Sequence, residues 1–256
     1  MPSLADDLAC ALDPVRLARR MGIEPDPWQA RVLRSPAHQV ILNNSRQVGK
    51  STITSVLAAH TALYEPGAPV LLLSPSERQS VELLRKVKAS LGALGAEAVE
   101  LEKDNTLSLE FASGSRILAL PGKEGTIRGF SGVRLLVIDE ASRVPDALYQ
   151  AVRPMLAVSG GRIVLLSTPF GKRGFFHHEW TEGGADWERI SITAYECPRI
   201  DPTWLDAERR RIGDWWFRQE FLCEFVDTID QVFSYDDVMG AVSAAVAPLF
   251  PLEVSR

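Results

Sequence analysis

The sequence predicts an α/β fold with a central, mostly parallel sheet flanked by helices and a small C-terminal lid subdomain. Three observations lead to this prediction. Short apolar segments alternate with segments of helical periodicity, which is typical of sheets built from strand–helix–strand units. Several of the short segments are apolar throughout, as strands covered on both faces are. Glycine and aromatic residues become frequent after Pro169, which indicates a second, smaller unit.

The first part of the chain predicts two buried strands, each followed by a helix. Residues 40–42 form the first apolar segment, and apolar residues then recur at helical spacing over 51–63. Residues 70–73 form the second strand. We expect Ser76 to cap the next helix, in which apolar residues recur up to Leu91.

The middle of the chain adds a hairpin and two more buried strands. Residues 107–111 and 116–120 alternate between apolar and polar on either side of an Ala-Ser-Gly-Ser turn, which favours a β-hairpin. Residues 135–138 and 163–166 are expected to be buried strands. Residues 145–156 between them predict a helix with a proline in its first turn.

The last third predicts a strand at 189–192, a helix after Pro202 and a tryptophan-rich helix around 215–217. Together these patterns divide the chain into three parts. We expect a core at residues 1–169, the lid subdomain at 170–226 and a connector at 227–256.

The composition is that of an ordinary globular protein. Of 256 residues, 46% are hydrophobic and 24% charged, which excludes disordered and collagen-like classes. Three scattered cysteines predict neither a disulfide framework nor a zinc site. A net charge of −5 argues against a surface coated with DNA-binding charge. We expect no membrane partner, because no apolar run approaches the ~18–20 residues that span a bilayer.

A phosphate-binding loop is the central motif. It lies between the first strand and its helix, where backbone N–H groups and the helix N-terminus can bind a polyphosphate. Lys50 is expected to reach the β- and γ-phosphates of ATP, and the Ser51 hydroxyl to bind Mg²⁺. Asn44 stands where the consensus has glycine, and asparagine tolerates left-handed backbone. The expected nucleotide-binding residues here are Asn44, Ser45, Arg46, Gln47, Val48, Gly49, Lys50, Ser51 and Thr52.

An acidic pair follows the strand at 135–138. Strand ends at this edge of an open α/β sheet are where ligands bind. We expect Asp139 to hold Mg²⁺ and Glu140 to orient and polarise the attacking water. With the loop, this pair predicts a P-loop NTPase of the ASCE or RecA-like type that hydrolyses ATP.

Small polar residues follow the strand at 163–166. Ser167 and Thr168 are expected to lie beside the γ-phosphate and to sense its loss, which is a coupling role.

Upstream of the loop, the Gln29 amide is expected to read the adenine edge, since it can both donate and accept hydrogen bonds.

Three arginines compete for the role of stabilising transition-state charge. Arg46 lies within the loop, Arg128 lies in a glycine-rich stretch before the acidic strand, and Arg143 follows the acidic pair. An arginine in this role is worth about 10³–10⁵ in turnover. The sequence alone leaves the choice open.

Taken together, these motifs resemble the ATPase half of the large terminase subunit of tailed bacteriophages, which packages DNA. The variant loop with its Arg46-Gln47 pair, the Asp139-Glu140 pair, Ser167-Thr168, the upstream Gln29 and the Arg128-Gly129 loop each have a counterpart in that family. The resemblance covers roughly residues 20–225.

The resemblance implies a function and partners. It implies an ATP- and Mg²⁺-dependent motor that moves double-stranded DNA into a procapsid, in the cytoplasm of the infected bacterial host. The capsid portal and the small terminase subunit are the expected protein partners, and self-association would give a ring of five subunits. The resemblance also implies that Arg46 acts in cis and Arg128 on a neighbour's ATP. The family's nuclease half is not expected within residues 227–256.

Two other functions share some of these motifs. A DEAD-like helicase or DNA-remodelling ATPase has the glutamine, the phosphate loop and the acidic pair, but needs a second RecA-like domain. A nucleotide-dependent assembly module would bind without hydrolysis, and would typically lack Lys50 or Glu140, both of which are present.

Overall fold

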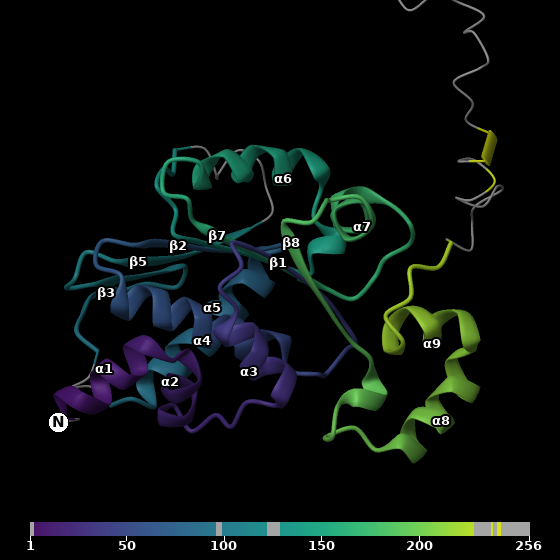
Figure 1. Ribbon diagram of the computed structural model, residues 1–256, viewed down its shortest axis with the longest axis horizontal. Coiled ribbons are helices and arrows are strands. Elements are labelled where there is room, and N and C mark those ends of the chain that lie inside the picture. The colour runs from purple at the N-terminus through teal and green to yellow at the C-terminus, as the bar shows by residue number, and fades with distance from the viewer. Residues whose placement is uncertain (1–2, 96–98, 122–128, 228–236, 238–239, 242–256) are drawn as a thin grey trace, which may run out of the picture.

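The computed structural model describes residues 3–95, 99–121, 129–227, 237 and 240–241 (Figure 1). In this part of the chain one eight-stranded sheet runs through the molecule in the order β3-β4-β5-β2-β6-β7-β1-β8. The strands are β1 (Gln39–Asn44), β2 (Pro69–Ser74), β3 (Leu101–Asp104), β4 (Ser108–Phe111), β5 (Arg116–Pro121), β6 (Leu135–Asp139), β7 (Arg162–Ser167) and β8 (Trp187–Ile192).

The sheet is mostly parallel, which confirms the predicted fold class. The strands from β5 across to β8 pair in parallel, and β3 and β4 add antiparallel pairs at one edge. Strand β7 lies between β1 and β6. Because β1, β7 and β6 are parallel, the phosphate loop, the Ser167-Thr168 segment and the acidic pair all emerge at the same edge of the sheet.

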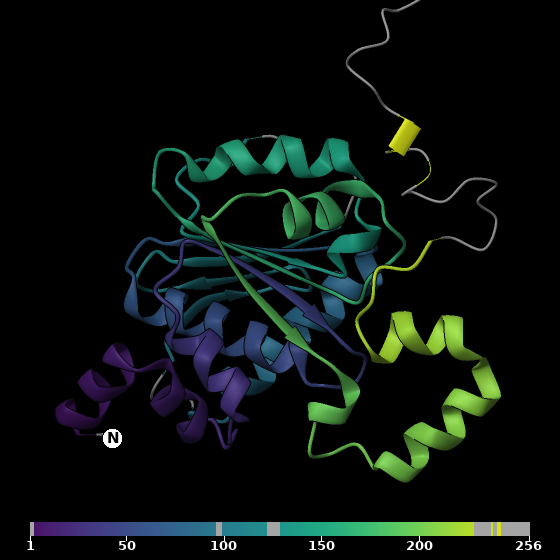
Figure 2. The ribbon, with the colours of Figure 1, turned by 45° about the vertical axis from the view of Figure 1, so that its right-hand side comes forward.

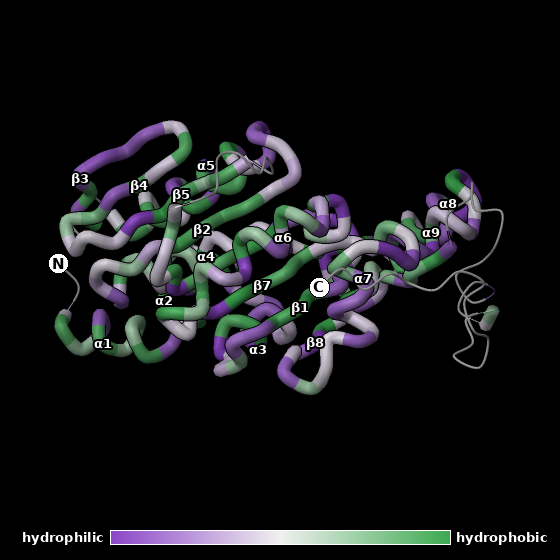
Figure 3. Tube along the Cα trace, turned by 90° about the horizontal axis from the view of Figure 1, so that it is seen from above, coloured by the Kyte–Doolittle hydropathy of each residue, from purple (hydrophilic) through white to green (hydrophobic). Residues whose placement is uncertain are grey.

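The central strands are covered on both faces, as their continuous apolar sequences require. In β1, Val40 and Leu42 pack on one face while Ile41 packs on the other, and the three side chains are fully buried. Strands β1, β2 and β7 are accordingly hydrophobic in Figure 3, whereas the exposed edge strand β3 is hydrophilic. The strands that carry the candidate site are therefore held rigidly from both sides.

Two layers of helices cover the sheet (Figure 1). One face carries α1 to α5, and the other carries α6 and α7 (Figure 2). The helices are α1 (Leu4–Leu12), α2 (Pro14–Arg20), α3 (Pro27–Arg34), α4 (Lys50–Tyr64), α5 (Glu77–Gly92), α6 (Asp146–Val152), α7 (Gly174–Thr181), α8 (Pro202–Ile212) and α9 (Asp214–Phe221). Short 3₁₀ helices are η2 (Ala141–Arg143), η3 (Arg153–Leu156) and η4 (Ala194–Glu196).

The helix expected over 145–156 is shorter than predicted. Pro145 is the N-cap of α6 rather than part of its first turn, and α6 ends at Val152. A 3₁₀ helix continues to Leu156, because Pro154 has no N–H for the α-helical ladder. By contrast, Ser76 caps α5 as expected and accepts a hydrogen bond from the Gln79 N–H.

The predicted division at residue 169 is not where the sheet ends. Strand β8 falls within the expected lid, yet it pairs with β1 along its whole length, and α7 packs on the sheet. The peripheral part begins after β8. Residues 194–223, here called the C-terminal helical unit, have a small core of Ala194, Leu205, Phe217 and Phe221, and α8 and α9 stand apart from the sheet (Figure 2).

The expected connector at 227–256 lies almost entirely outside the described residues. No described helix is long and apolar enough to cross a membrane.

Candidate functional site

The phosphate loop joins β1 to α4 in a tight turn. Gln47 has a φ of 63° and Gly49 a φ of 93°, both in the left-handed region. A Cβ at position 49 would lie 2.7 Å from the Nε2 atom at the end of the Gln29 side chain, and the left-handed conformation itself favours glycine there. The first N–H groups of α4 have no acceptor within the helix, which makes its start suited to an anion.

Lys50 fills the inside of the loop. Its Nζ atom donates to the Asn44 and Ser45 carbonyl oxygens, both at 3.3 Å. The side chain is buried, which lowers the pKa of Lys50, while Glu140 and Asp139 act in the opposite direction. The ammonium group is thus poised between the loop carbonyls and the acidic pair, where a phosphate group would complete its coordination.

The acidic pair lies at the end of β6. Burial, and then the neighbouring charge of Glu140, raise the pKa of Asp139 to about 6. Glu140 adopts a left-handed backbone conformation with a φ of 50°, and its N–H donates to the Asp139 Oδ1 atom at 3.0 Å. A non-glycine residue in this conformation is strained, and such strain clusters at functional sites.

A hollow of about 560 Å³ brings the start of α4 and the acidic pair together. Its lining includes Ser51, Asp139 and Glu140, together with Lys86 and Gln79 from α5. Ser51 and Asp139 offer the hard oxygen ligands that Mg²⁺ prefers, and the raised pKa of Asp139 reflects a carboxylate that a cation would stabilise.

The described residues contain no group of three or more histidine, cysteine or acidic side chains fit to hold a metal alone. This agrees with the usual mode of Mg²⁺ binding, in which one or two protein oxygens act with substrate phosphates and water. The residues present therefore fit Mg²⁺ bound together with a nucleotide.

The Arg46 side chain is paired with a residue of α9. Its Nε atom forms an ion pair with Glu220 of α9, and its backbone N–H donates to the Glu220 carbonyl oxygen. The Glu220 side chain is 10% exposed and that of Arg46 57%. In this conformation the arginine joins the loop to the C-terminal helical unit, a partner that the sequence did not reveal.

The Ser167-Thr168 segment is bonded to the residues that follow the acidic pair. The Ser142 hydroxyl lies 2.7 Å from the Ser167 Oγ atom and donates to the Thr168 carbonyl oxygen at 2.8 Å. The Ser142 N–H also donates to Ser167 Oγ. The ends of β6 and β7 are therefore linked, and Ser142 is a site residue that no sequence motif had marked.

Gln29 lies against the outer side of the loop and is buried. Its Oε1 atom accepts a hydrogen bond from the Asp26 N–H at 2.9 Å, and its Nε2 atom faces the Val48 and Gly49 carbonyl oxygens at 3.5 and 3.4 Å. Both polar atoms of the amide thus have partners in the protein. Its expected role in reading adenine stays a prediction.

Of the other two arginines, only Arg143 lies in the described part of the chain. Its guanidinium group stacks on the Phe170 ring, 4.1 Å from the ring centroid. Arg128 lies outside the described residues.

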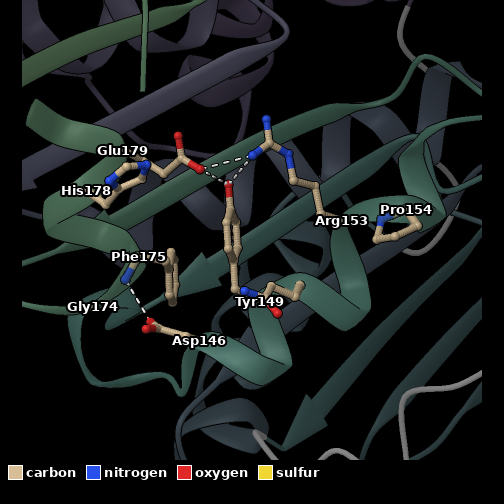
Figure 4. Close-up of a pocket in the computed structure, with 9 residues that line it drawn as sticks. Asp146, Tyr149, Arg153, Pro154, Gly174, Phe175, His178 and Glu179 are labelled. Carbon is tan, nitrogen blue, oxygen red and sulfur yellow. Dashed lines mark hydrogen bonds and ion pairs between the residues drawn. The ribbon is translucent and has the colours of Figure 1, made fainter. Parts of the chain in front are cut away.

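Another hollow, of about 710 Å³, lies between α6 and α7 (Figure 4). Tyr149 and Arg153 both donate to the Glu179 Oε1 atom, at 2.8 and 3.0 Å, and Trp187 donates to Oε2. The Tyr149 ring also stacks on Phe175 with centroids 4.1 Å apart. These contacts hold α7 against α6, so we assign this hollow a structural role.

Comparisons with known proteins match this arrangement. The family described as terminase large subunit, T4likevirus-type, N-terminal, matches residues 41–239. The large terminase subunit of Thermus virus P23-45 is 26% identical over 254 residues, and the match covers 86% of this chain and 52% of that protein. This chain spans about half the length of the curated relatives it matches.

Solved structures share the fold. The large terminase ATPase domain of Thermus phage P74-26 superposes with a TM-score of 0.73 at 23% identity, covering 82% of this chain and 97% of that one. The large terminase of the thermophilic bacteriophage D6E in complex with ATP-gamma-S gives a TM-score of 0.63 at 14% identity, covering 78% of this chain and 52% of that one.

Proposed function

The chain belongs to the T4likevirus-type terminase large-subunit family, and from this premise we propose that it hydrolyses ATP to drive double-stranded viral DNA into a procapsid. The observation that carries the proposal is the meeting of Lys50 and Ser51 with Asp139 and Glu140 at one edge of the sheet. A phosphate-binding loop beside a half-buried acidic pair is the arrangement that hydrolysis of a nucleoside triphosphate requires.

Each residue of this edge has a chemical role in the proposal. The loop N–H groups and Lys50 bind the phosphates, and Thr52 and the other loop residues shape their cradle. Ser51 and Asp139 hold Mg²⁺, which supplies charge neutralisation at the phosphates. Glu140 accepts a proton from the attacking water and orients it. When the γ-phosphate is lost, Ser167 and Thr168 shift, and their hydrogen bonds pass this shift on to Ser142 in η2.

The roles proposed for Arg46 and Arg128 rest on different observations. Arg46 lies in the loop and near enough to Glu140 to interact with its charge, which supports a cis role once its pairing with Glu220 is broken. Arg128 is proposed to act on a neighbouring subunit's ATP. That assignment rests on the family resemblance, since Arg128 lies outside the described residues.

The proposed partners follow from the family. They are double-stranded DNA, the capsid portal, the small terminase subunit and further copies of the chain in a ring, within the cytoplasm of the infected host. A ring with an arginine supplied in trans predicts that activity depends on association. An isolated monomer would hydrolyse ATP slowly.

The test is ATP hydrolysis across a wide range of protein concentration, with Lys50→Ala, Arg128→Ala and the control Arg210→Ala. We expect specific activity to rise with concentration in the wild type and in the control. Lys50→Ala should lower the specific activity by more than about 100-fold. In Arg128→Ala the specific activity should no longer rise with protein concentration. Flat specific activity with an active Arg128→Ala would exclude the trans role, and an active Lys50→Ala would exclude the proposed site.

A further inference from the structure

Arg199 joins the C-terminal helical unit to the outer side of the phosphate loop. It lies between η4 and α8. One terminal nitrogen of its guanidinium group donates to the Asp26 carboxylate at 2.7 Å, and the other donates to the Val48 carbonyl oxygen at 2.9 Å. Arg199 is 151 residues from Val48 in the sequence, and no motif pointed to it.

The two hydrogen bonds of Arg199 use the edge of its guanidinium group and not its flat faces. Guanidinium N–H groups lie in the plane of the group, so both hydrogen bonds fix the plane without covering it. The side chain is 49% exposed, whereas the Asp26 side chain that anchors it is 11% exposed. A rigidly held, partly open cationic plane therefore stands beside the loop.

This plane lies at the turn of the phosphate loop, beside Gln29, the residue that the sequence predicts to read the adenine edge. A Cβ built on Gly49 would be 3.4 Å from the Arg199 Nη2 atom and 2.7 Å from the Gln29 Nε2 atom. Both side chains thus meet at the turn of the loop. Gln29 is buried and both polar atoms of its amide face protein partners, whereas the Arg199 side chain is 49% exposed. Guanidinium planes stack well on aromatic rings.

We propose that Arg199 is the stacking platform for the nucleobase of the bound nucleotide, and so a specificity-determining residue of the site. The inference rests on the proposed function, because it needs a nucleotide with its phosphates in the loop. It also gives the C-terminal helical unit a direct contact with that nucleotide, made by the same side chain that ties the unit to Asp26 and Val48.

The test separates the contribution of the base to binding affinity from that of the phosphates. Affinities for ATP-gamma-S and for inorganic tripolyphosphate are measured by calorimetry with Mg²⁺, and their ratio reports what base and ribose contribute. We expect Arg199→Ala to reduce this ratio by about 5- to 30-fold. Arg199→Lys keeps the charge but not the plane, so it should leave tripolyphosphate binding unchanged and still reduce the ratio by about threefold.

Controls make each outcome informative. Arg210→Ala removes an exposed arginine of α8 and should leave the ratio unchanged. An unchanged ratio in both Arg199 variants, or equal weakening of both ligands, would overturn the inference and leave Arg199 as a support of the loop wall. Should Arg199→Ala fail to fold, Arg199→Lys decides. A wild type that binds neither ligand would instead overturn the proposed function.

Discussion

The sheet edge and the C-terminal helical unit are built in contrasting ways. The edge carries its residues on strands that are fully buried on both faces, with Ile41, Val137 and Leu165 as examples. The helical unit has a core of four buried residues. Polar contacts join it to the loop and to β1, namely Arg46 with Glu220, Arg199 with Val48, and the Asn43 amide donating to the Cys223 carbonyl at 2.8 Å, while Cys197 packs into the core beneath the sheet.

The difference teaches which part of the molecule can respond to a nucleotide. Buried apolar packing is not altered by a phosphate, so the edge keeps its geometry. Ion pairs and hydrogen bonds to a loop can be exchanged for bonds to phosphate oxygens, which are strong acceptors. We expect the helical unit to move with the nucleotide state while the sheet stays fixed.

The largest expected effect is a loss of stability in the C-terminal helical unit that leaves the sheet unaffected. Phe217 is fully buried in the small core of the helical unit, and Phe217→Ala should destabilise that unit by about 3–5 kcal/mol. Hydrogen exchange is expected to quicken over α8 and α9 and to stay slow in β1 and β7. Equal quickening in the sheet would show that the two regions unfold together.

A second prediction concerns the edge alone and uses pH. The raised pKa of Asp139, about 6, means that below about pH 6 the metal-free protein holds a proton that Mg²⁺ must displace. Below pH 6, Mg²⁺-dependent nucleotide binding should weaken by up to about tenfold per pH unit, and above it the binding should level off. The free energy of unfolding of the metal-free protein changes in the opposite direction. It falls as the pH rises from about 4 to 6, because the folded protein holds the Asp139 proton more tightly than the unfolded chain does.

The control for this pH dependence is Asp139→Asn, which carries no titrating group. It should bind nucleotide with Mg²⁺ weakly at every pH, with no inflection near 6. An inflection that survives in Asp139→Asn would mean that another group binds the proton.

A third prediction tests the contact between the two regions. Glu220→Gln keeps the side-chain size but removes the charge that holds Arg46. The arginine is then available to phosphate, so ATP-gamma-S affinity should rise by about three- to tenfold. Glu224→Gln is the matched control, since Glu224 pairs with Arg218 within the same part of the chain. Unchanged affinity in Glu220→Gln would show that the pair does not compete with phosphate.

The smallest expected effect lies in the link between β6 and β7. Ser142→Ala removes the hydroxyl that contacts Ser167 and Thr168 and should lower the free energy of unfolding by about 1 kcal/mol. A double-mutant cycle with Ser167→Ala measures the coupling. Strictly additive losses would mean that the two hydroxyls stabilise the protein independently.

The same contrast explains what could be predicted from the sequence. The strands of the sheet follow from continuous apolar runs, and the loop and the acidic pair each lie within a short contiguous motif. Glu220 and Arg199 are 174 and 151 residues from their partners in the loop, so no local pattern marks them. Strand β8 was expected, but its place beside β1 depends on long-range pairing, so the sequence did not show that the sheet continues beyond residue 169.

Single-turnover hydrolysis by Glu140→Gln tests the central claim most directly, namely that the sheet edge is a catalytic centre for ATP. The control is Glu102→Gln on the exposed strand β3. We expect Glu140→Gln to bind ATP with the wild-type affinity and to release phosphate at least about 100-fold more slowly, because the water lacks its base. Phosphate release at the wild-type rate from Glu140→Gln would contradict the account.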